Sequence, residues 1–183
     1  MEKLSKINSS TWSTGTLDVK KSPLLELFTG VIKEIYWAEN HLLRTLLKMK
    51  HASTSTALQD ALDDHLNVTK EHTSRLWNIF GLLDEKIDSR ECKVMEGLAR
   101  CVEETIEYSD EGTAVRDLGL ILAWQKIKNY EIATYTSLLK LAMIIGRDDI
   151  AVLLSENLEE ENQCNEDFTP IMEVVAHNAI KEG

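Results

Sequence analysis

Hydrophobic residues recur every three to four positions along most of the chain after residue 22, and this spacing places them on one face of a helix. The first series follows Ser22-Pro23, where a serine cap and a proline at the first helical position favour a helix start. We therefore predict a long amphipathic helix over residues 23–51. The residues of its apolar face are Leu24, Phe28, Ile32, Ile35, Leu42, Leu46 and Met49.

A short polar turn separates this helix from a second one. The stretch HASTSTAL, residues 51–58, has room only for a turn and a new helix cap. A turn of this length joins antiparallel neighbours, so the two segments are predicted to form a helical hairpin. The second apolar series reaches about residue 83 and consists of Leu58, Ala61, Leu62, Leu66, Leu76, Ile79 and Phe80.

Two more long helices are expected in the second half of the chain. One spans about residues 114–145 and stops at Gly146, which suits a left-handed C-terminal cap. The next starts at Asp148 or Asp149, and Pro170 within it predicts a kink or an early end near residue 169. The connection over residues 84–113 contains a shorter amphipathic helix with Val94, Met95, Leu98, Val102 and Ile106 on one side.

Four long helices with a short, a long and a short connection favour an all-α, ferritin-like four-helix bundle. The long second connection then contains an extra helix and lets the second and third long helices run parallel. Only 8 glycines and 2 prolines among 183 residues disfavour a turn-rich β fold. We expect residues 1–22 to form a flexible N-terminal tail and residues 23–183 to form a single bundle domain.

Charge and cysteine content narrow the expected partners. The 31 acidic and 20 basic residues give a net charge of −11, which repels a phosphate backbone, so no nucleic-acid partner is expected. The chain has no run of about 18 uncharged apolar residues, so we expect no contact with a membrane. The 3 cysteines form no CxxC pair, and no signal-like leader is present, so we expect a cytoplasmic protein.

Polar residues interrupt the apolar face of every long helix near its middle. Glu39 interrupts the first face, His65 and His72 the second, Glu131 the third and Glu161 the fourth. A buried charge costs several kcal/mol unless it is paired, hydrogen-bonded or bound to a metal. These positions are therefore the candidates for chemistry.

The interruptions fall at matching depth in each predicted hairpin. With a turn near residue 53, Glu39 lies opposite position 67, between the two histidines. With a turn near residue 147, Glu131 lies opposite position 163, close to Glu161. Carboxylates and imidazoles that converge in a bundle core are the ligands of di-iron and di-manganese sites.

A complete site of this type uses two Glu-x-x-His pairs, and this chain departs from that pattern. The second helix offers Thr69-x-x-His72, and the fourth offers Glu161-x-x-Cys164. We therefore predict at most five ligands, which are Glu39, His72, Glu131, Glu161 and either His65 or Glu160.

Each candidate also has a structural interpretation. Glu39 can pair with a histidine in a metal-free buried network, and His65 and His72 can be hydrogen-bonded core or rim residues. The run EEE at residues 159–161 is typical of a solvated helix face. Cys164 is either a thiolate ligand or a small buried thiol.

Five stretches of the sequence together resemble the YciE/YciF group of ferritin-like bacterial stress proteins. They are LLELFTGVIKEIYWAENHLLRTLLKM, HLNVTKEHTSRLWNIF, CKVMEGL, VRDLGLILAWQKIKNYEIATYTSLLKLAMIIG and LLSENLEEENQCNEDF. The resemblance covers about residues 24–170 and implies a ferritin-like bundle, a homodimer and a link to stress responses, with no assigned activity. By analogy with ferritins and rubrerythrins, it implies metal ligands at Glu39, His72, Glu131 and Glu161.

The chain differs from this group at several polar positions, and two hypotheses follow. It has Lys128-Asn129 where relatives have Glu-His, Cys101 where they have Glu, and Asn165 where they have Asp. In the first hypothesis the bundle binds a dinuclear iron or manganese centre that oxidises ferrous iron or reduces peroxide. In the second, Lys128 replaces a cation and pairs with Glu131 or Glu161, and the protein is a metal-free, non-catalytic stress-related dimer.

Overall fold

The computed structural model describes residues 22–182, apart from the side chains of residues 165–167. Within this range the chain forms helices and no strand, which confirms the all-α prediction. The tail expected at residues 1–22 falls outside the described residues except for Ser22. The helices are α1 (Pro23–Ala52), α2 (Thr56–Leu82), α3 (Lys93–Tyr108), α4 (Ala114–Ile144) and α5 (Asp148–Glu182).

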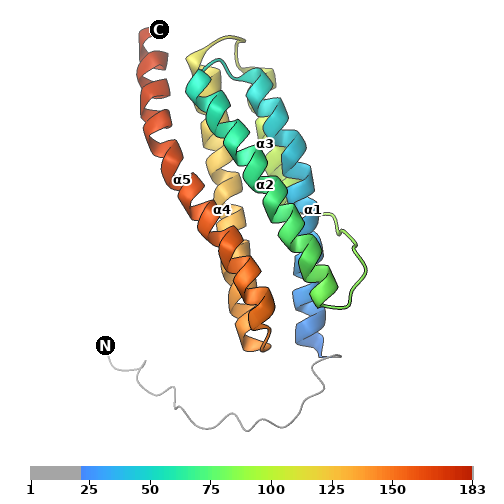
Figure 1. Cartoon of the computed structure of the whole chain (residues 1–183). Coiled ribbons are helices and arrows are strands. Elements are labelled where there is room, and N and C mark those ends of the chain that lie inside the picture. The colour runs from blue at the N-terminus through green and yellow to red at the C-terminus, as the bar shows by residue number, and fades with distance from the viewer. Residues whose placement is uncertain (1–21, 183) are drawn as a thin grey trace, which may run out of the picture.

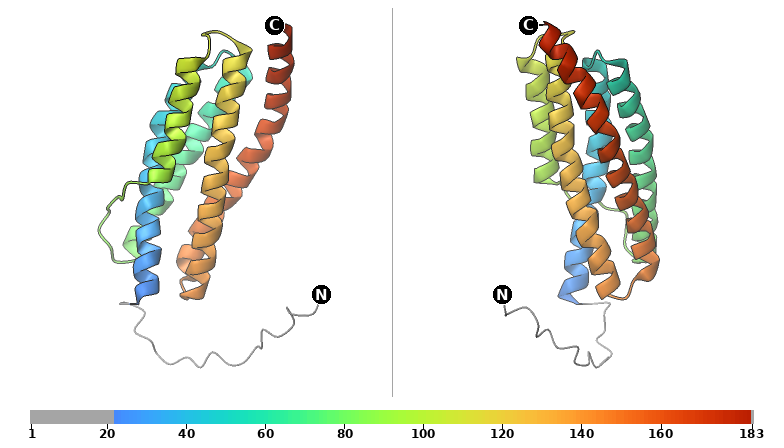
Figure 2. Two further views of the ribbon diagram at one scale, coloured as in Figure 1. Left: turned by 180° about the vertical axis from the view of Figure 1, so that it is seen from behind. Right: turned by 90° about the vertical axis from the view of Figure 1, so that its left-hand side faces the viewer.

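Helices α1, α2, α4 and α5 form a four-helix bundle (Figure 1). Short turns after α1 and α4 make α1 antiparallel to α2 and α4 antiparallel to α5. The connection over residues 83–113 returns the chain to the end of the bundle where α2 began, so α2 and α4 run in the same direction (Figures 1 and 2). This is the crossover topology predicted from the sequence.

Helix α3 packs outside the four-helix bundle, against α1 and α4. Its buried face consists of Met95, Ala99 and Val102. Cys92 caps its N-terminus, and the Cys92 thiol lies 3.0 Å from the Tyr130 hydroxyl on α4. The amphipathic segment expected in the connection is therefore a helix that covers one side of the bundle.

Capping interactions fix the level of the bundle helices relative to one another. The Asp117 carboxylate on α4 accepts hydrogen bonds from the backbone N–H of Thr54 at 2.9 Å and of Ser55 at 2.7 Å. The α1–α2 turn is thereby held against the first turn of α4. At the opposite end Gly146 has φ of 73°, the left-handed conformation expected after α4.

Helix α5 continues through Pro170 as far as Glu182, so the early end considered for residue 169 is wrong. A proline removes one backbone hydrogen bond without ending a helix whose other contacts persist. Helix α5 changes direction part-way along its length (Figures 1 and 2). The Glu182 carboxylate accepts from the backbone N–H of Ala114 at 2.8 Å, which ties the last turn of α5 to the start of α4.

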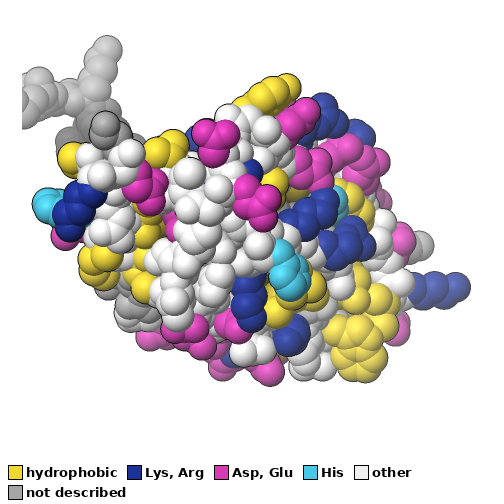
Figure 3. All heavy atoms as spheres, turned by 90° about the horizontal axis from the view of Figure 1, so that it is seen from above, with side chains coloured by type: hydrophobic (Ala, Val, Ile, Leu, Met, Phe, Trp, Pro, Cys, Tyr) yellow, Lys and Arg dark blue, Asp and Glu magenta, His cyan; other side chains and the backbone are white. Residues whose placement is uncertain are grey.

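The buried interior is mostly apolar, although polar side chains such as Thr45, Arg116 and Asp117 are also buried. Charged side chains of both signs are intermixed on the end seen from above (Figure 3). No helix in the described range has both the length and the apolar character that crossing a membrane requires. The interior includes Trp124 and Phe168, whose rings stack with centroids 3.3 Å apart.

Candidate metal centre

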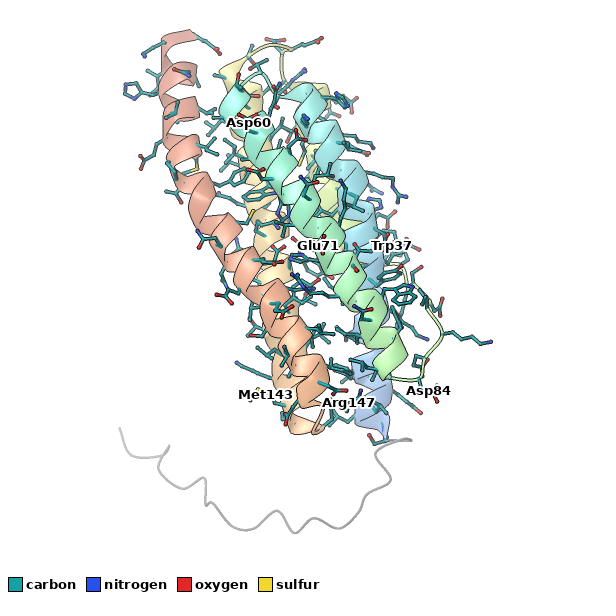
Figure 4. The ribbon with its side chains drawn as sticks, in the orientation of Figure 1. Trp37, Asp60, Glu71, Asp84, Met143 and Arg147 are labelled. Atoms are coloured by element: carbon teal, nitrogen blue, oxygen red, sulfur yellow. The ribbon has the colours of Figure 1, made fainter. Side chains whose placement is uncertain are left out.

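Polar side chains from all four bundle helices meet in the interior. Each of them has a relative exposure of 0%, whereas Glu71, the residue before His72, lies on the outer side of α2 (Figure 4). The structure thus brings together every site residue that the sequence predicted, with one lysine added. The buried residues are Glu39 on α1, His65 and His72 on α2, Lys128 and Glu131 on α4, and Glu161 on α5.

Glu39, His72 and Glu161 form a first set, which we name the His72 group. One ligand atom from each residue lies within 4.8 Å of the others. The His72 Nδ1 atom is 3.3 Å from Glu39 Oε1 and 3.3 Å from Glu161 Oε1. Two carboxylates and one imidazole nitrogen therefore face one another at distances at which they can share a cation.

Two residues at the rim of the bundle orient the His72 ring. His72 Nε2 is 3.0 Å from Glu160 Oε2, and Arg75 donates to both oxygens of that carboxylate at 2.7 Å. Because a carboxylate only accepts, His72 Nε2 carries the proton in this contact. The Nδ1 atom is thus directed to the buried carboxylates, as in the carboxylate–histidine pairs that position metal ligands.

The buried carboxylates also change the acid–base properties of His72. Burial acts to lower the pKa of His72, but Glu39 and Glu161 outweigh burial and raise this pKa above its ordinary value. The negative charge of the two carboxylates stabilises a proton on Nδ1 in the metal-free protein, just as it would stabilise a metal ion there. Metal and proton therefore compete for this nitrogen.

Tyr135 supports Glu39 from the neighbouring helix α4. Its hydroxyl donates a hydrogen bond to Glu39 Oε1. Burial and the adjacent Glu39 carboxylate raise the pKa of Tyr135 well above its ordinary value, so the phenol remains a donor. The same oxygen lies 3.3 Å from His72 Nδ1, whereas Glu39 Oε2 has no hydrogen-bond partner among the described residues.

His65, Glu131 and Glu161 form a second set, which we name the His65 group; its ligand atoms also lie within 4.8 Å of one another. The ammonium of Lys128 lies among them. Lys128 Nζ is 2.5 Å from His65 Nε2, 2.9 Å from Glu131 Oε2 and 2.5 Å from Glu161 Oε2. Burial acts to lower the pKa of Lys128, but Glu131 and Glu161 raise it above its ordinary value, so the side chain is a cation.

His65 is held as a neutral imidazole. Burial and the Lys128 charge place its pKa well below the ordinary value. Its Nε2 atom accepts from Lys128, so its Nδ1 atom carries the proton and faces Cys164 Sγ at 3.1 Å. Cys164 therefore contacts the far side of the His65 ring from Lys128.

Several buried atoms of the two groups have no hydrogen-bond partner in the described part of the molecule. They are Glu39 Oε2, His72 Nδ1, Glu161 Oε1 and both carboxylate oxygens of Glu131, of which Oε2 forms the ion pair with Lys128. Unpartnered carboxylate oxygens in a dry interior cost free energy unless a cation meets them. The donors are carboxylates and imidazoles, which suit iron and manganese, so the residues present fit such an ion.

Of the two residues considered for the fifth ligand, only His65 is in the buried set. The side chain of Glu160 is 36% exposed and lies at the rim. Cys101 is half-buried on α3, outside the four-helix bundle, and Asn129 is exposed. The side chain of Asn165 lies outside the described residues.

Sequence reasoning missed Arg75. Besides Glu160, this guanidinium binds Asn157 Oδ1 at 2.9 Å, so it links α2 to α5 beside the buried groups. The available signal was its position three residues after His72, which places both residues on one side of α2.

The family model described as a domain of unknown function, DUF892, matches residues 23–181. The chain belongs to this family. It is 36% identical to the Escherichia coli K12 protein YciF over 147 residues, which cover 80% of this chain and 88% of YciF. The resemblance to the YciE/YciF group is therefore confirmed.

Solved structures support the same assignment. The crystal structure of the E. coli stress protein YciF matches with a TM-score of 0.80 and 33% identity, covering 86% of this chain and 99% of that one. YcfI from Rhodopseudomonas palustris matches with a TM-score of 0.76 and 31% identity, covering 81% and 94%. A Xanthomonas campestris protein, 14% identical with a TM-score of 0.71 over 88% and 98% of the two chains, shares the fold.

Proposed function

We propose that this protein is a YciF-like stress protein that binds iron or manganese in the core of its bundle. The observation that carries the proposal is the convergence of Glu39, His72 and Glu161, whose unpartnered atoms face one another in the interior. The similarity to the E. coli stress protein YciF supports the link to stress, and the residues of this chain support the metal.

The residues of the His72 group have distinct roles in this proposal. Glu39 and Glu161 provide anionic oxygens, and His72 provides Nδ1, which Glu160 and Arg75 keep directed inward. Iron or manganese held by such donors would supply redox chemistry, either oxidation of ferrous iron by oxygen or reduction of a peroxide by the bound metal.

Metal content tests the proposal directly. The full chain, purified without chelator, is incubated aerobically with Fe²⁺ or Mn²⁺, desalted and analysed by inductively coupled plasma mass spectrometry. A formed site approaches full occupancy, so at least one ion per chain is expected, and less than about 0.2 ion per chain overturns the proposal.

A matched pair of variants separates the buried centre from surface binding. Glu39→Gln removes a buried charge at nearly constant volume, and Glu71→Gln makes the same change on the exposed side of α2. We expect Glu39→Gln to lose the ion and Glu71→Gln to keep it. Equal metal content in both variants contradicts binding by the His72 group.

The position of Lys128 favours a second candidate function, a metal-free homodimer that acts in stress by binding a partner protein. Its buried ammonium neutralises part of the charge of Glu131 and Glu161 without any metal. Replacing Glu39 and Glu131 together by Gln separates the candidates. The second function leaves stress tolerance of the host unchanged, whereas the first predicts loss of metal and of ferrous-iron oxidation.

A further inference from the structure

The ammonium of Lys128 lies at the point on which all three donors of the His65 group converge. Its Nζ atom is within 2.9 Å of His65 Nε2, Glu131 Oε2 and Glu161 Oε2. We propose that Lys128 is a built-in cation that occupies the second metal position, so that the centre takes one divalent ion, at the His72 group. This inference rests on the proposed metal-binding function and adds its stoichiometry.

Space excludes a second ion while Lys128 is in place. Metal ions bind histidine nitrogen and carboxylate oxygen at about 2.0–2.2 Å, so an ion held by these three atoms needs the volume that the ammonium fills. Lys128 has a relative exposure of 0%, and its Nζ atom lies 5.2 Å from the centre of the Trp124 ring. The cation–π contact and the three acceptors hold the ammonium at this position.

Charge also favours one ion. The two groups contain three carboxylates, Glu39, Glu131 and Glu161. With all three ionised, one ammonium and one divalent ion neutralise them, whereas two divalent ions beside Lys128 leave two excess positive charges in a buried site, against one excess charge when Lys128 is absent. Because a buried net charge is strongly unfavourable, the neutral combination is the stable one.

The donors of the His72 group remain available, in contrast to those of the His65 group. His72 Nδ1, Glu39 Oε2 and Glu161 Oε1 have no hydrogen-bond partner among the described residues. Glu161 directs Oε1 to His72 and Oε2 to Lys128, so it serves both cations. An ion at the His72 group therefore gives these three atoms a partner without displacing Lys128.

The experiment counts Mn²⁺ ions in the full-length protein and in two lysine variants. Lys128→Ala empties the second position, and Lys126→Ala removes an exposed lysine two residues earlier on α4. Each protein is titrated with Mn²⁺, and bound metal is measured by mass spectrometry. Electron paramagnetic resonance then distinguishes an isolated Mn²⁺ ion from an exchange-coupled pair.

We expect one Mn²⁺ per chain with the spectrum of an isolated ion in the wild type and in Lys126→Ala. We expect two ions and a coupled spectrum in Lys128→Ala. A wild type that binds a coupled pair, or a folded Lys128→Ala that still binds a single ion, overturns the inference. Lys128→Gln is the substitute if Lys128→Ala does not fold, and a wild type that binds neither Mn²⁺ nor Fe²⁺ instead overturns the proposed function.

Discussion

The buried centre has two halves, the His72 group and the His65 group, which use the same kinds of donor but differ in their cation. The His72 group and the His65 group share Glu161, and each adds one glutamate and one histidine. In the His65 group an ammonium contacts all three donors, whereas in the His72 group three atoms, Glu39 Oε2, His72 Nδ1 and Glu161 Oε1, have no hydrogen-bond partner among the described residues.

The difference shows how a single side chain decides what a polar core can bind. Lys128 lies one turn before Glu131 on α4, so it reaches the same set of donors from the same helix. Buried carboxylates need a positive partner, which either the chain or a ligand supplies. The sequence of α4 supplies one to the His65 group and none to the His72 group.

The largest effect is expected from removing the built-in cation in metal-free protein. Lys128→Ala leaves Glu131 and Glu161 buried without their partner, so the free energy of unfolding should fall by about 3–5 kcal/mol. Urea unfolding in the presence of a chelator measures this change. The exposed Lys126→Ala should change it by no more than about 0.5 kcal/mol, and equal effects of the two variants would show that the ammonium stabilises nothing.

Adding metal should stabilise the folded protein through the His72 group, which has no built-in cation. Free Mn²⁺ at about 100 times its Kd should raise the free energy of unfolding of the wild type by about 2.7 kcal/mol, because the ion binds only the folded state. Glu39→Gln should lose this increase, and Glu71→Gln should retain it. Unfolding curves with and without Mn²⁺ provide the test, and an undiminished increase in Glu39→Gln contradicts the comparison.

A smaller effect is expected at the rim, where Glu160 orients His72. Glu160→Gln removes the charge that Arg75 and His72 Nε2 both contact, so Mn²⁺ affinity should fall about 10–100-fold. Calorimetric titration measures the affinity. Glu159→Gln alters the exposed neighbour and should leave the affinity unchanged; the same result for Glu160→Gln would mean that the rim pair does not position the ring.

Much of the fold could be predicted because apolar spacing and turn length directly reflect helix packing. Ser22-Pro23, Gly146 and the polar stretch at residues 51–58 marked the helix ends closely. The outcome at Pro170 could not be predicted, since it depends on tertiary contacts of α5 on both sides of the proline.

Helix phase also located most of the candidate centre. Glu39, His72, Glu131 and Glu161 occupy positions where apolar residues belong, and each is buried. Phase alone could not choose between His65 and Glu160 as the fifth residue.

Helix phase could not predict where the charged ends of the two long side chains, Lys128 and Arg75, would lie. The ammonium of Lys128 and the guanidinium of Arg75 lie several bonds from the backbone, so their endpoints depend on the other helices. The departure from relatives at Lys128 predicted its pairing with Glu131 or Glu161, and the structure has both ion pairs. The contact of Arg75 with Glu160 gave no sequence signal beyond its helical face.

Glu161 joins the two halves through its two oxygens, 3.3 Å from His72 Nδ1 and 2.5 Å from Lys128 Nζ. Negative charge drawn toward one cation is less available to the other. The two interactions are thermodynamically linked. If an ion beside His72 weakens the Lys128–Glu161 ion pair by some factor, loss of that ion pair raises the affinity for the ion by the same factor. One shared carboxylate thus makes occupancy on α2 and ion pairing on α4 a single coupled equilibrium.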